Sequence, residues 1–192
     1  MGTGQFRTFD TMCSNQLNAE QAAVVAQVIG KFGTYATQRT HMVSDSRQVQ
    51  KGDIFVAYPF DPLHNDAKHD GRSYADTAVR NGARALLWQL DGQVTAKFSV
   101  PTGGVEDLNQ LAGHIASAYY GKPSEHMRMI AVTGTNGKTS SAQWLAQVLS
   151  QHELPCGIMG TLGVGFPNAM VETGFTTPQA VEVHRYLNDM RS

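Results

Sequence analysis

The residues from Gly134 to Ser140, which read Gly-Thr-Asn-Gly-Lys-Thr-Ser, are of types that bind phosphate groups. Glycines at 134 and 137 allow a tight turn that aims successive backbone N–H groups at one point, where a following helix adds partial positive charge. Lys138 can reach outer phosphates as a point charge, and the Thr139 hydroxyl can join the coordination shell of a phosphate-bound magnesium ion. The segment therefore predicts a polyphosphate-binding loop.

The residues around this loop support the prediction, although the match to the general pattern G-x-x-x-x-G-K-[ST] is partial because Val132 stands at its first position. The apolar run at 127–132 predicts a strand that leads into the loop. Helical spacing of Ala142, Leu145, Ala146 and Leu149 predicts the helix that leaves it. The alternative, an ordinary strand-to-helix turn with a solvated lysine, requires strand, helix and Gly-Lys-Thr to coincide by chance.

The elements after this helix predict a second strand and a final helix. Residues 156–161 are expected to form a strand parallel to 127–132, reached by the crossover helix. The glycines at 163 and 165 and Pro167-Asn168 indicate a turn or a hairpin. Thr177 and Pro178 are expected as N-cap and first residue of the last helix. The buried stripe of that helix is predicted to contain Ala180, Val183, Leu187 and Met190.

The first 125 residues alternate between strand and helix patterns, which predicts an α/β fold. Strands are expected at 41–47, where a short strand ends in polar residues, at 54–58 and at 83–88, with a weaker one near 97–100. A helix capped by Asn18 should stop at Gly30 or Gly33, a second should close at Asn81-Gly82, and a third should cover 108–119. Residues 121–126 indicate a linker. We therefore predict two domains, 1–125 and 126–192, the second of which starts a parallel-sheet nucleotide domain.

Composition excludes several classes of protein. The 192 residues carry a net charge of −1 with no basic block, so we expect no nucleic-acid or membrane-surface partner. Cys13 and Cys156 suggest no disulfide framework, and no run of about 18 apolar residues predicts a membrane span. A cytoplasmic monomer is expected.

A cluster of histidine and aspartate residues falls in the segment 59–71, which has the composition of an exposed loop. A metal site there is disfavoured because the loop offers no frame to fix ligand spacing. A solvated turn, or hydrogen bonds from this loop to a ligand, fits its composition better.

A series of motifs in this order resembles the Mur ligases, and among them the MurE type. They are Ser44-Asp45-Ser46-Arg47, Lys51-Gly52-Asp53-Ile54-Phe55-Val56-Ala57, His69-Asp70-Gly71-Arg72, Tyr120-Gly121-Lys122-Pro123-Ser124, the loop at 133–139, Met159-Gly160-Thr161 and Thr176-Thr177-Pro178. The resemblance runs from about residue 40 to the end. A MurF-like or folylpolyglutamate-like ligase, which shares the loop, is the alternative enzyme.

The resemblance implies an ATP- and Mg²⁺-dependent ligase of peptidoglycan synthesis that adds diaminopimelate or lysine to UDP-MurNAc-L-Ala-D-Glu through an acyl phosphate. It implies that the first domain binds the uridine nucleotide, and that Lys138 and Thr139 act in catalysis, Thr139 also towards magnesium. The implied ATP contacts are Gly134, Thr135, Asn136, Gly137, Lys138, Thr139 and Ser140. The implied substrate contacts are Ser44, Ser46, Lys68, His69, Thr176 and Thr177.

One part of a phosphoryl-transfer site is missing from the sequence. No carboxylate after Ser140 stands at the end of an apolar strand, where such sites hold magnesium. Residues 126–192 are also about half of an ordinary α/β nucleotide domain. We therefore expect the chain alone to show no ligase turnover, which leaves a module that only binds the UDP-muramoyl peptide or nucleotide as a third possibility.

Overall fold

The computed structural model describes residues 16–36, 40–60, 69–91, 98–174 and 177–191. The helices are α2 (Ala19–Phe32), α3 (Ala75–Arg80), α4 (Leu108–Tyr119), α5 (Lys138–Gln151) and α6 (Ala180–Arg191), with short 3-10 turns η1 (Gly33–Tyr35), η2 (Gly71–Tyr74) and η3 (Pro123–His126). The strands are β1 (Met42–Val43), β2 (Ile54–Ala57), β3 (Ala85–Gln89), β4 (Thr102–Val105), β5 (Ile158–Gly160), β6 (Gly163–Phe166) and β7 (Ala169–Val171).

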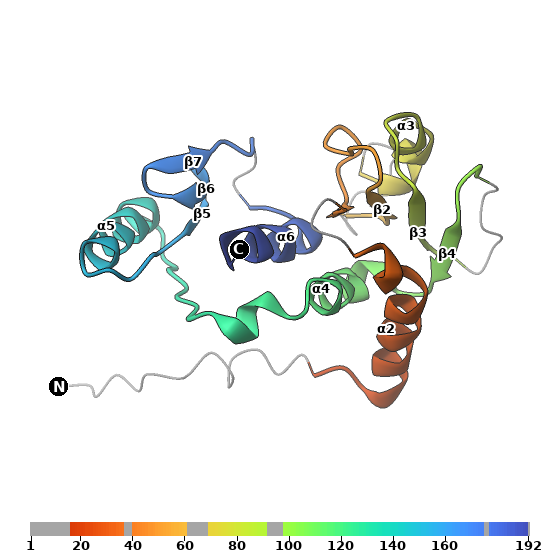
Figure 1. The fold of residues 1–192 in the computed structure, drawn as a ribbon, viewed down its shortest axis with the longest axis horizontal. Coiled ribbons are helices and arrows are strands. Elements are labelled where there is room, and N and C mark those ends of the chain that lie inside the picture. The colour runs from red at the N-terminus through yellow and green to blue at the C-terminus, as the bar shows by residue number, and fades with distance from the viewer. Residues whose placement is uncertain (1–15, 37–39, 61–68, 92–97, 175–176, 192) are drawn as a thin grey trace.

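Strands β1 to β4 form a parallel sheet in sequence order, which confirms the α/β fold (Figure 1). Successive side chains of a strand point to opposite faces. In β2, Ile54 and Val56 join the core formed with α2 and α4, whereas Phe55 and Ala57 join a second core with α3. Because helices cover both faces, all four residues of β2 are buried.

Helix α2 begins where the sequence predicts. The Asn18 side chain accepts the Gln21 N–H at 2.8 Å, and the Gln21 side chain accepts the Asn18 N–H at 3.1 Å. This reciprocal capping satisfies two donors that have no partner inside the helix. The helix runs through Gly30 and ends at Phe32 with Gly33 as its C-cap, so of the two predicted stop signals Gly33 is confirmed and Gly30 is wrong.

The last strand of the sheet lies outside the segment that the sequence predicts. Residues 98–100 of the strand expected near 97–100 form no strand, and residue 97 lies outside the described residues; β4 instead spans Thr102–Val105 and pairs with β3. Its two central residues are glycines, which have low strand propensity and hide the element. Close packing explains Gly103, since a Cβ atom there would lie 2.7 Å from Phe32 Cε2.

The second sheet differs from the predicted parallel pair. Strand β5 pairs antiparallel with β6, and β6 pairs antiparallel with β7, as the glycines and Pro167-Asn168 indicate. Residues 127–132 form no strand in the described structure, and Ile130 and Val132 remain 60% and 39% exposed. A strand exists only through hydrogen bonds to a neighbouring strand, and no described segment pairs with 127–132. The predicted β-α-β unit is therefore wrong for these residues.

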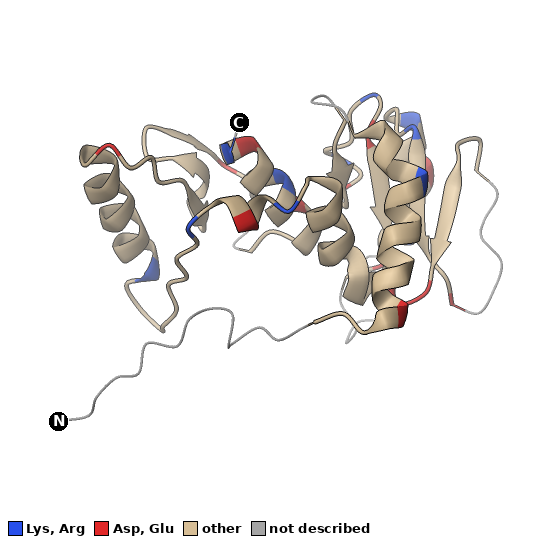
Figure 2. Cartoon of the chain, turned by 60° about the horizontal axis from the view of Figure 1, so that its bottom comes forward, with Lys and Arg blue, Asp and Glu red and all other residues tan. Residues whose placement is uncertain are grey.

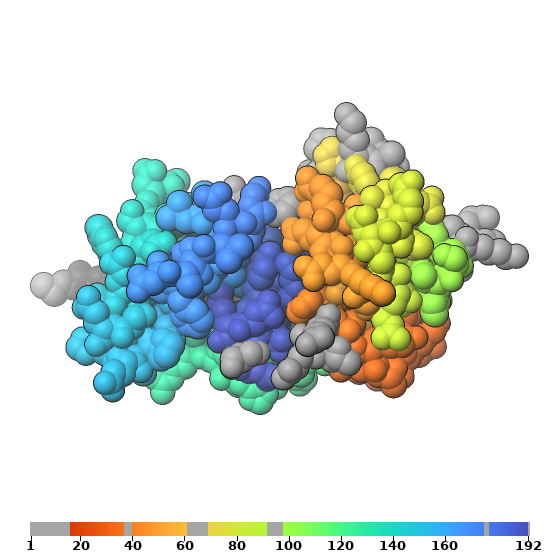
Figure 3. All heavy atoms as spheres, turned by 45° about the horizontal axis from the view of Figure 1, so that its top comes forward, coloured from red at the N-terminus to blue at the C-terminus, as the bar shows by residue number. Residues whose placement is uncertain are grey.

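Helix α6 begins later than predicted, and its buried face agrees only in part with the predicted stripe, of which Leu187 is buried and Val183 and Met190 are half-buried. The Val183 N–H donates to the Gln179 carbonyl at 3.0 Å, and the helix starts at Ala180, so Thr177 is not its N-cap. Its buried residues are Val181, Glu182 and Leu187, while Ala180 is exposed. The face shifts because α6 packs against α4, η3 and β1, and also contacts β6 (Figures 1 and 3).

Charged residues are scattered over the described elements and gather on none of them (Figure 2). Ion pairs form locally, as between Asp45 and Arg47 and between Lys122 and Glu125. The Lys122–Glu125 pair is exposed on both sides and therefore contributes little to stability. The described surface therefore offers no basic stripe of the kind that binds nucleic acid.

Substitution of two glycines tests the packing of β4. Gly103→Ala should lower the free energy of unfolding by about 1–3 kcal/mol, because the new methyl group meets the buried Phe32 ring. Gly30→Ala is the matched control, because its Cβ atom has nothing within 4 Å, and it should raise stability by about 0.5–1 kcal/mol. Urea unfolding measures both. Equal effects of the two substitutions would contradict this account.

The pH dependence of stability tests the packing of α6 on α4. Burial lowers the pKa of His184 below its ordinary value of 6.5, and nearby His114 lowers it further. The folded state therefore resists protonation of His184, so its stability is full above about pH 6.5 and falls as the pH drops towards the folded pKa. His184→Gln should flatten this fall in urea unfolding between about pH 5 and 8. The same substitution at the exposed His152 should leave it unchanged.

Candidate functional site

The predicted phosphate loop has the backbone geometry that its glycines allow. Gly134 has φ of 141° and Gly137 has φ of 77°, conformations that side chains disfavour. Gly137 is the N-cap of α5, so Lys138 and Thr139 begin the first helical turn. The first N–H groups of a helix lack partners within it and carry partial positive charge. Residues 131–140 are all exposed, so the N–H groups at the start of α5 are open to solvent. The start of a helix with free N–H groups is suited to bind an anion.

The Lys138 side chain folds over this loop. Its Nζ donates to the Gly134 carbonyl at 2.5 Å and lies 3.4 Å from the Thr135 carbonyl. The ammonium group is therefore held at the concave side of the turn by backbone oxygens. A phosphate oxygen could replace either carbonyl as its partner, since the ammonium group has three rotatable donors.

A cavity of about 280 Å³ lies beside the loop. Lys138 and Thr139 line it from α5, the segment 156–162 lines it from around β5, and Thr177 borders it from the chain that leads to α6. Three motifs that are distant in the sequence therefore meet at one hollow. The face of α5 predicted to be buried turns inward, with Ala146 fully buried and Trp144 68% exposed.

A second cavity, of about 460 Å³, lies at the carboxyl end of β1. Ser44 and Ser46 line it together with two aromatic residues, Phe60 and Tyr74, and with Gln179. This volume falls in the range of small-molecule sites. His69 lies beside it, because its carbonyl accepts the Phe60 N–H at 3.0 Å and its ring packs edge-on to Phe60 at 6.2 Å. Lys68 and Thr176, also predicted to bind substrate, lie outside the described residues.

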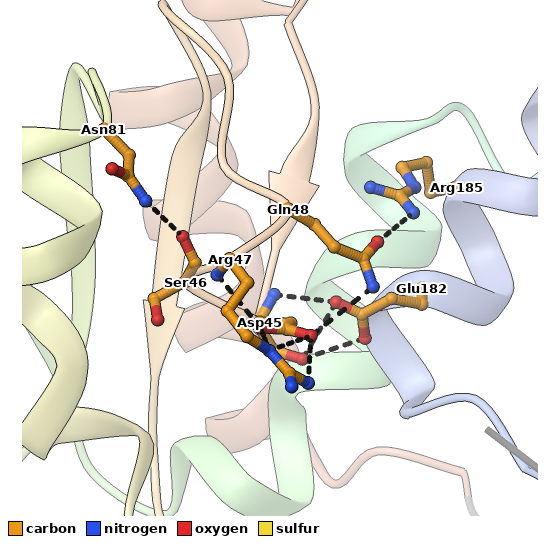
Figure 4. Close-up of polar contacts among 8 residues, drawn as sticks. Asp45, Ser46, Arg47, Gln48, Asn81, Glu182 and Arg185 are labelled. Carbon is orange, nitrogen blue, oxygen red and sulfur yellow. Dashed lines mark hydrogen bonds and ion pairs between the residues drawn. The ribbon is translucent and has the colours of Figure 1, made fainter. Parts of the chain in front are cut away.

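Charged side chains hold the segment after β1 in place (Figure 4). Asp45 accepts the Arg47 N–H at 3.0 Å and pairs with the Arg47 guanidinium at 2.8 Å. Burial raises the pKa of Asp45, but hydrogen bonds and charge from Arg47 outweigh it and leave that pKa below its usual value. Asn81 donates to the Ser46 carbonyl at 2.9 Å, which fixes the next turn of this segment to the end of α3. The wall of the cavity is therefore pre-formed.

The sequence reasoning misses Glu182, which contacts this segment from α6. The Glu182 carboxylate is 4% exposed and accepts the Ser44 N–H at 2.7 Å. A single acidic residue, on the side of the helix predicted to be polar, carries no signal of this contact. Gln48 is held from the same helix by Arg185, at 2.9 Å.

The residues from Thr177 to Gln179 border both cavities, Thr177 the one at the phosphate loop and Gln179 the one after β1. A further cavity of about 600 Å³ opens between the β6–β7 hairpin and α6, on the face shown in Figure 3. In the smaller hollow, Lys138 stands in the first turn of α5, directly after the glycine that caps this helix. Among the described residues, no three His, Cys, Asp or Glu side chains gather as a metal site.

No helix in the described part of the chain is long and apolar enough to cross a membrane.

Comparisons with known proteins agree with the motif order. Residues 132–192 match the Mur ligase middle domain. The chain is 44% identical over 155 residues to the UDP-N-acetylmuramoyl-L-alanyl-D-glutamate--2,6-diaminopimelate ligase of Janthinobacterium sp. (strain Marseille), which covers 78% of this chain and 29% of that protein. It is 39% identical over 171 residues to the ligase of the same name from Ralstonia nicotianae, which covers 88% of this chain and 33% of the relative.

A solved structure, the MurF ligase from Thermotoga maritima in complex with ADP, aligns with a TM-score of 0.41 and 24% identity over 58% of this chain and 23% of that one. The chain spans about a third of the length of the curated relatives it matches. The matched middle domain begins directly before the phosphate loop, and identity to the ligases extends over most of the chain. The chain therefore belongs to the Mur ligase family, and within that family it is similar to the ligases that add diaminopimelate.

Proposed function

We propose that this chain forms the uridine-nucleotide-binding domain, residues 1–125, and the start of the ATP-binding domain, residues 126–192, of a MurE-type ligase. The reaction joins diaminopimelate to the D-glutamyl carboxylate of UDP-MurNAc-L-Ala-D-Glu through an acyl phosphate at the expense of ATP. The names of the relatives favour diaminopimelate over lysine as the added amino acid. Function as a cytoplasmic monomer is part of the same proposal.

One observation carries the proposal: the segment from Thr177 to Gln179 borders both the cavity after β1 and the cavity beside the phosphate loop. A substrate whose nucleotide end occupies the first cavity and whose peptide end reaches the second would pass along this segment. The Thr177 hydroxyl would then meet the muramoyl peptide close to Lys138. Such an arrangement brings a carboxylate and a bound nucleotide together, which is how positioning accelerates phosphoryl transfer.

The residues of the loop have separate roles in this proposal. Gly134 and Gly137 allow backbone N–H groups to surround phosphate oxygens, and the start of α5 stabilises their charge. Lys138 exchanges its carbonyl partners for phosphate oxygens and neutralises charge that develops during transfer. Thr139, exposed at the cavity, would supply a hydroxyl ligand to Mg²⁺. A bound Mg²⁺ ion would polarise the phosphate oxygens that coordinate it.

Replacement of the loop lysine tests the assignment of ATP. Lys138→Ala should weaken ATP binding by at least about tenfold, because a charge-assisted contact to phosphate is lost. UDP binding should remain unchanged, since the nucleotide of the substrate occupies the other cavity. Calorimetry of both ligands against the purified chain measures this, with the exposed Lys122→Ala as the matched control. Equal loss of ATP and UDP binding would contradict the division of roles.

The contribution of Thr139 to magnesium binding can be separated from its contribution to folding. Thr139→Val keeps the side-chain shape but removes the hydroxyl, so the gain in ATP affinity that Mg²⁺ gives the wild-type chain should shrink. Thr139→Ser keeps the hydroxyl and should retain that gain. Titration of ATP with and without Mg²⁺ distinguishes the three proteins. A full magnesium effect in Thr139→Val would remove Thr139 from the metal site.

A further inference from the structure

Glu182 and Ser44 form the most complete polar contact between α6 and the first sheet. The carboxylate of Glu182 accepts the Ser44 N–H through Oε1 at 2.7 Å, and Ser44 Oγ lies 2.9 Å from Oε1 and 2.8 Å from Oε2. Figure 4 shows Glu182 reaching from α6 towards the segment of Asp45 and Gln48. The backbone N–H and the side-chain hydroxyl of Ser44 therefore both point to the buried carboxylate of Glu182.

The number of protons fixes the direction of these hydrogen bonds. An ionised carboxylate only accepts, and a serine hydroxyl has one proton, so Ser44 donates that proton to Glu182. The Tyr58 hydroxyl also hydrogen-bonds Ser44. Burial raises the pKa of Tyr58, the charge of Glu182 raises it further, and the hydrogen bond with Ser44 offsets only part of this rise, so the phenol keeps its proton. Because the single Ser44 proton is given to Glu182, the Tyr58 hydroxyl is the donor to Ser44. One lone pair of the Ser44 hydroxyl is then left for a ligand.

The cavity at this wall therefore has a defined polarity. Ser44 lines the cavity as an acceptor, and the carboxylate that holds it makes this part of the wall unfavourable for a phosphate group. Arg47 also lines the cavity, but its guanidinium is paired with Asp45. The Ser44 N–H, which would otherwise suit an anion, is already used by Glu182. Phe60 and Tyr74 on the same cavity suit a flat, partly apolar group.

We propose that Glu182 is a positioning residue that holds Ser44 as a hydrogen-bond acceptor, so that this wall takes an N–H or O–H donor of the nucleoside and not the diphosphate. The inference rests on the proposed function, because it assumes that a uridine nucleotide occupies the cavity. It adds a residue from α6 to the nucleotide site of the first domain.

A double-mutant cycle on the 192-residue chain tests this coupling, with UDP and uridine as probes in calorimetry. Ser44→Ala and Glu182→Gln should each weaken both ligands by about tenfold, the effect of one hydrogen bond. The double variant should bind no more weakly than either single variant, because Glu182 acts only through Ser44. Asp189→Asn, on an exposed residue of α6, is the matched control and should bind as the wild type does.

Three results would overturn the inference while the proposed function stands: Glu182→Gln binding UDP as well as the wild type, losses that multiply in the double variant, or a loss for UDP without one for uridine. A wild-type chain that binds neither ligand would overturn the proposed function, and this inference with it. Proper folding is checked by amide exchange in NMR, where Glu182→Gln should accelerate exchange at Ser44 and leave the core amides unchanged.

If Glu182→Gln does not fold, Glu182→Asp provides the second variant. It keeps the carboxylate but shortens its reach, so Ser44 should be held less well and UDP should again bind more weakly. Wild-type affinity in a folded Glu182→Asp variant whose Ser44 amide exchanges faster would contradict the positioning role.

Discussion

The packing of α6 against the first sheet is the contact on which the arrangement of the site depends. Val181 is fully buried in the core that α2 and α4 share with the sheet, and Glu182 beside it holds the chain at the end of β1. Because α6 is fixed there, the preceding residues 177–179 lie between the two cavities. An apolar contact and a buried carboxylate thus join segments more than 130 residues apart in the sequence.

The two halves of the site are formed by different kinds of interaction. The phosphate loop depends on backbone freedom, because Gly134 and Gly137 adopt positive φ and Lys138 is held by loop carbonyls. The cavity after β1 depends instead on side-chain pairs that stiffen one wall, Arg47 with Asp45 and Glu182 with Ser44. The conformation of the loop needs little besides its own sequence, whereas the cavity after β1 is lined by groups from several elements.

Prediction from sequence succeeded where local chemistry decides structure. The cap of α2 by Asn18, the strand β2 and the helix start after Gly137 follow from short patterns and appear where expected. It failed where packing against neighbouring elements decides the structure. Gly103 lies in a strand because β4 pairs with β3, and Phe32 leaves room there only for glycine. Residues 127–132 are mostly apolar but pair with no described strand. Which strand a segment pairs with, and which face of a helix is buried, depend on the neighbouring element as much as on the segment itself.

The amino-acid sequence by itself determined the phosphate loop, the α/β class and the resemblance to Mur ligases, since glycine positions, hydrophobic periodicity and motif order are written along the chain. Only the tertiary structure decided that β5 belongs to an antiparallel sheet, that α6 begins at Ala180, and that Glu182 controls Ser44. The physical reason is that hydrogen-bond partners and buried faces are chosen in three dimensions, among residues that sequence spacing does not relate.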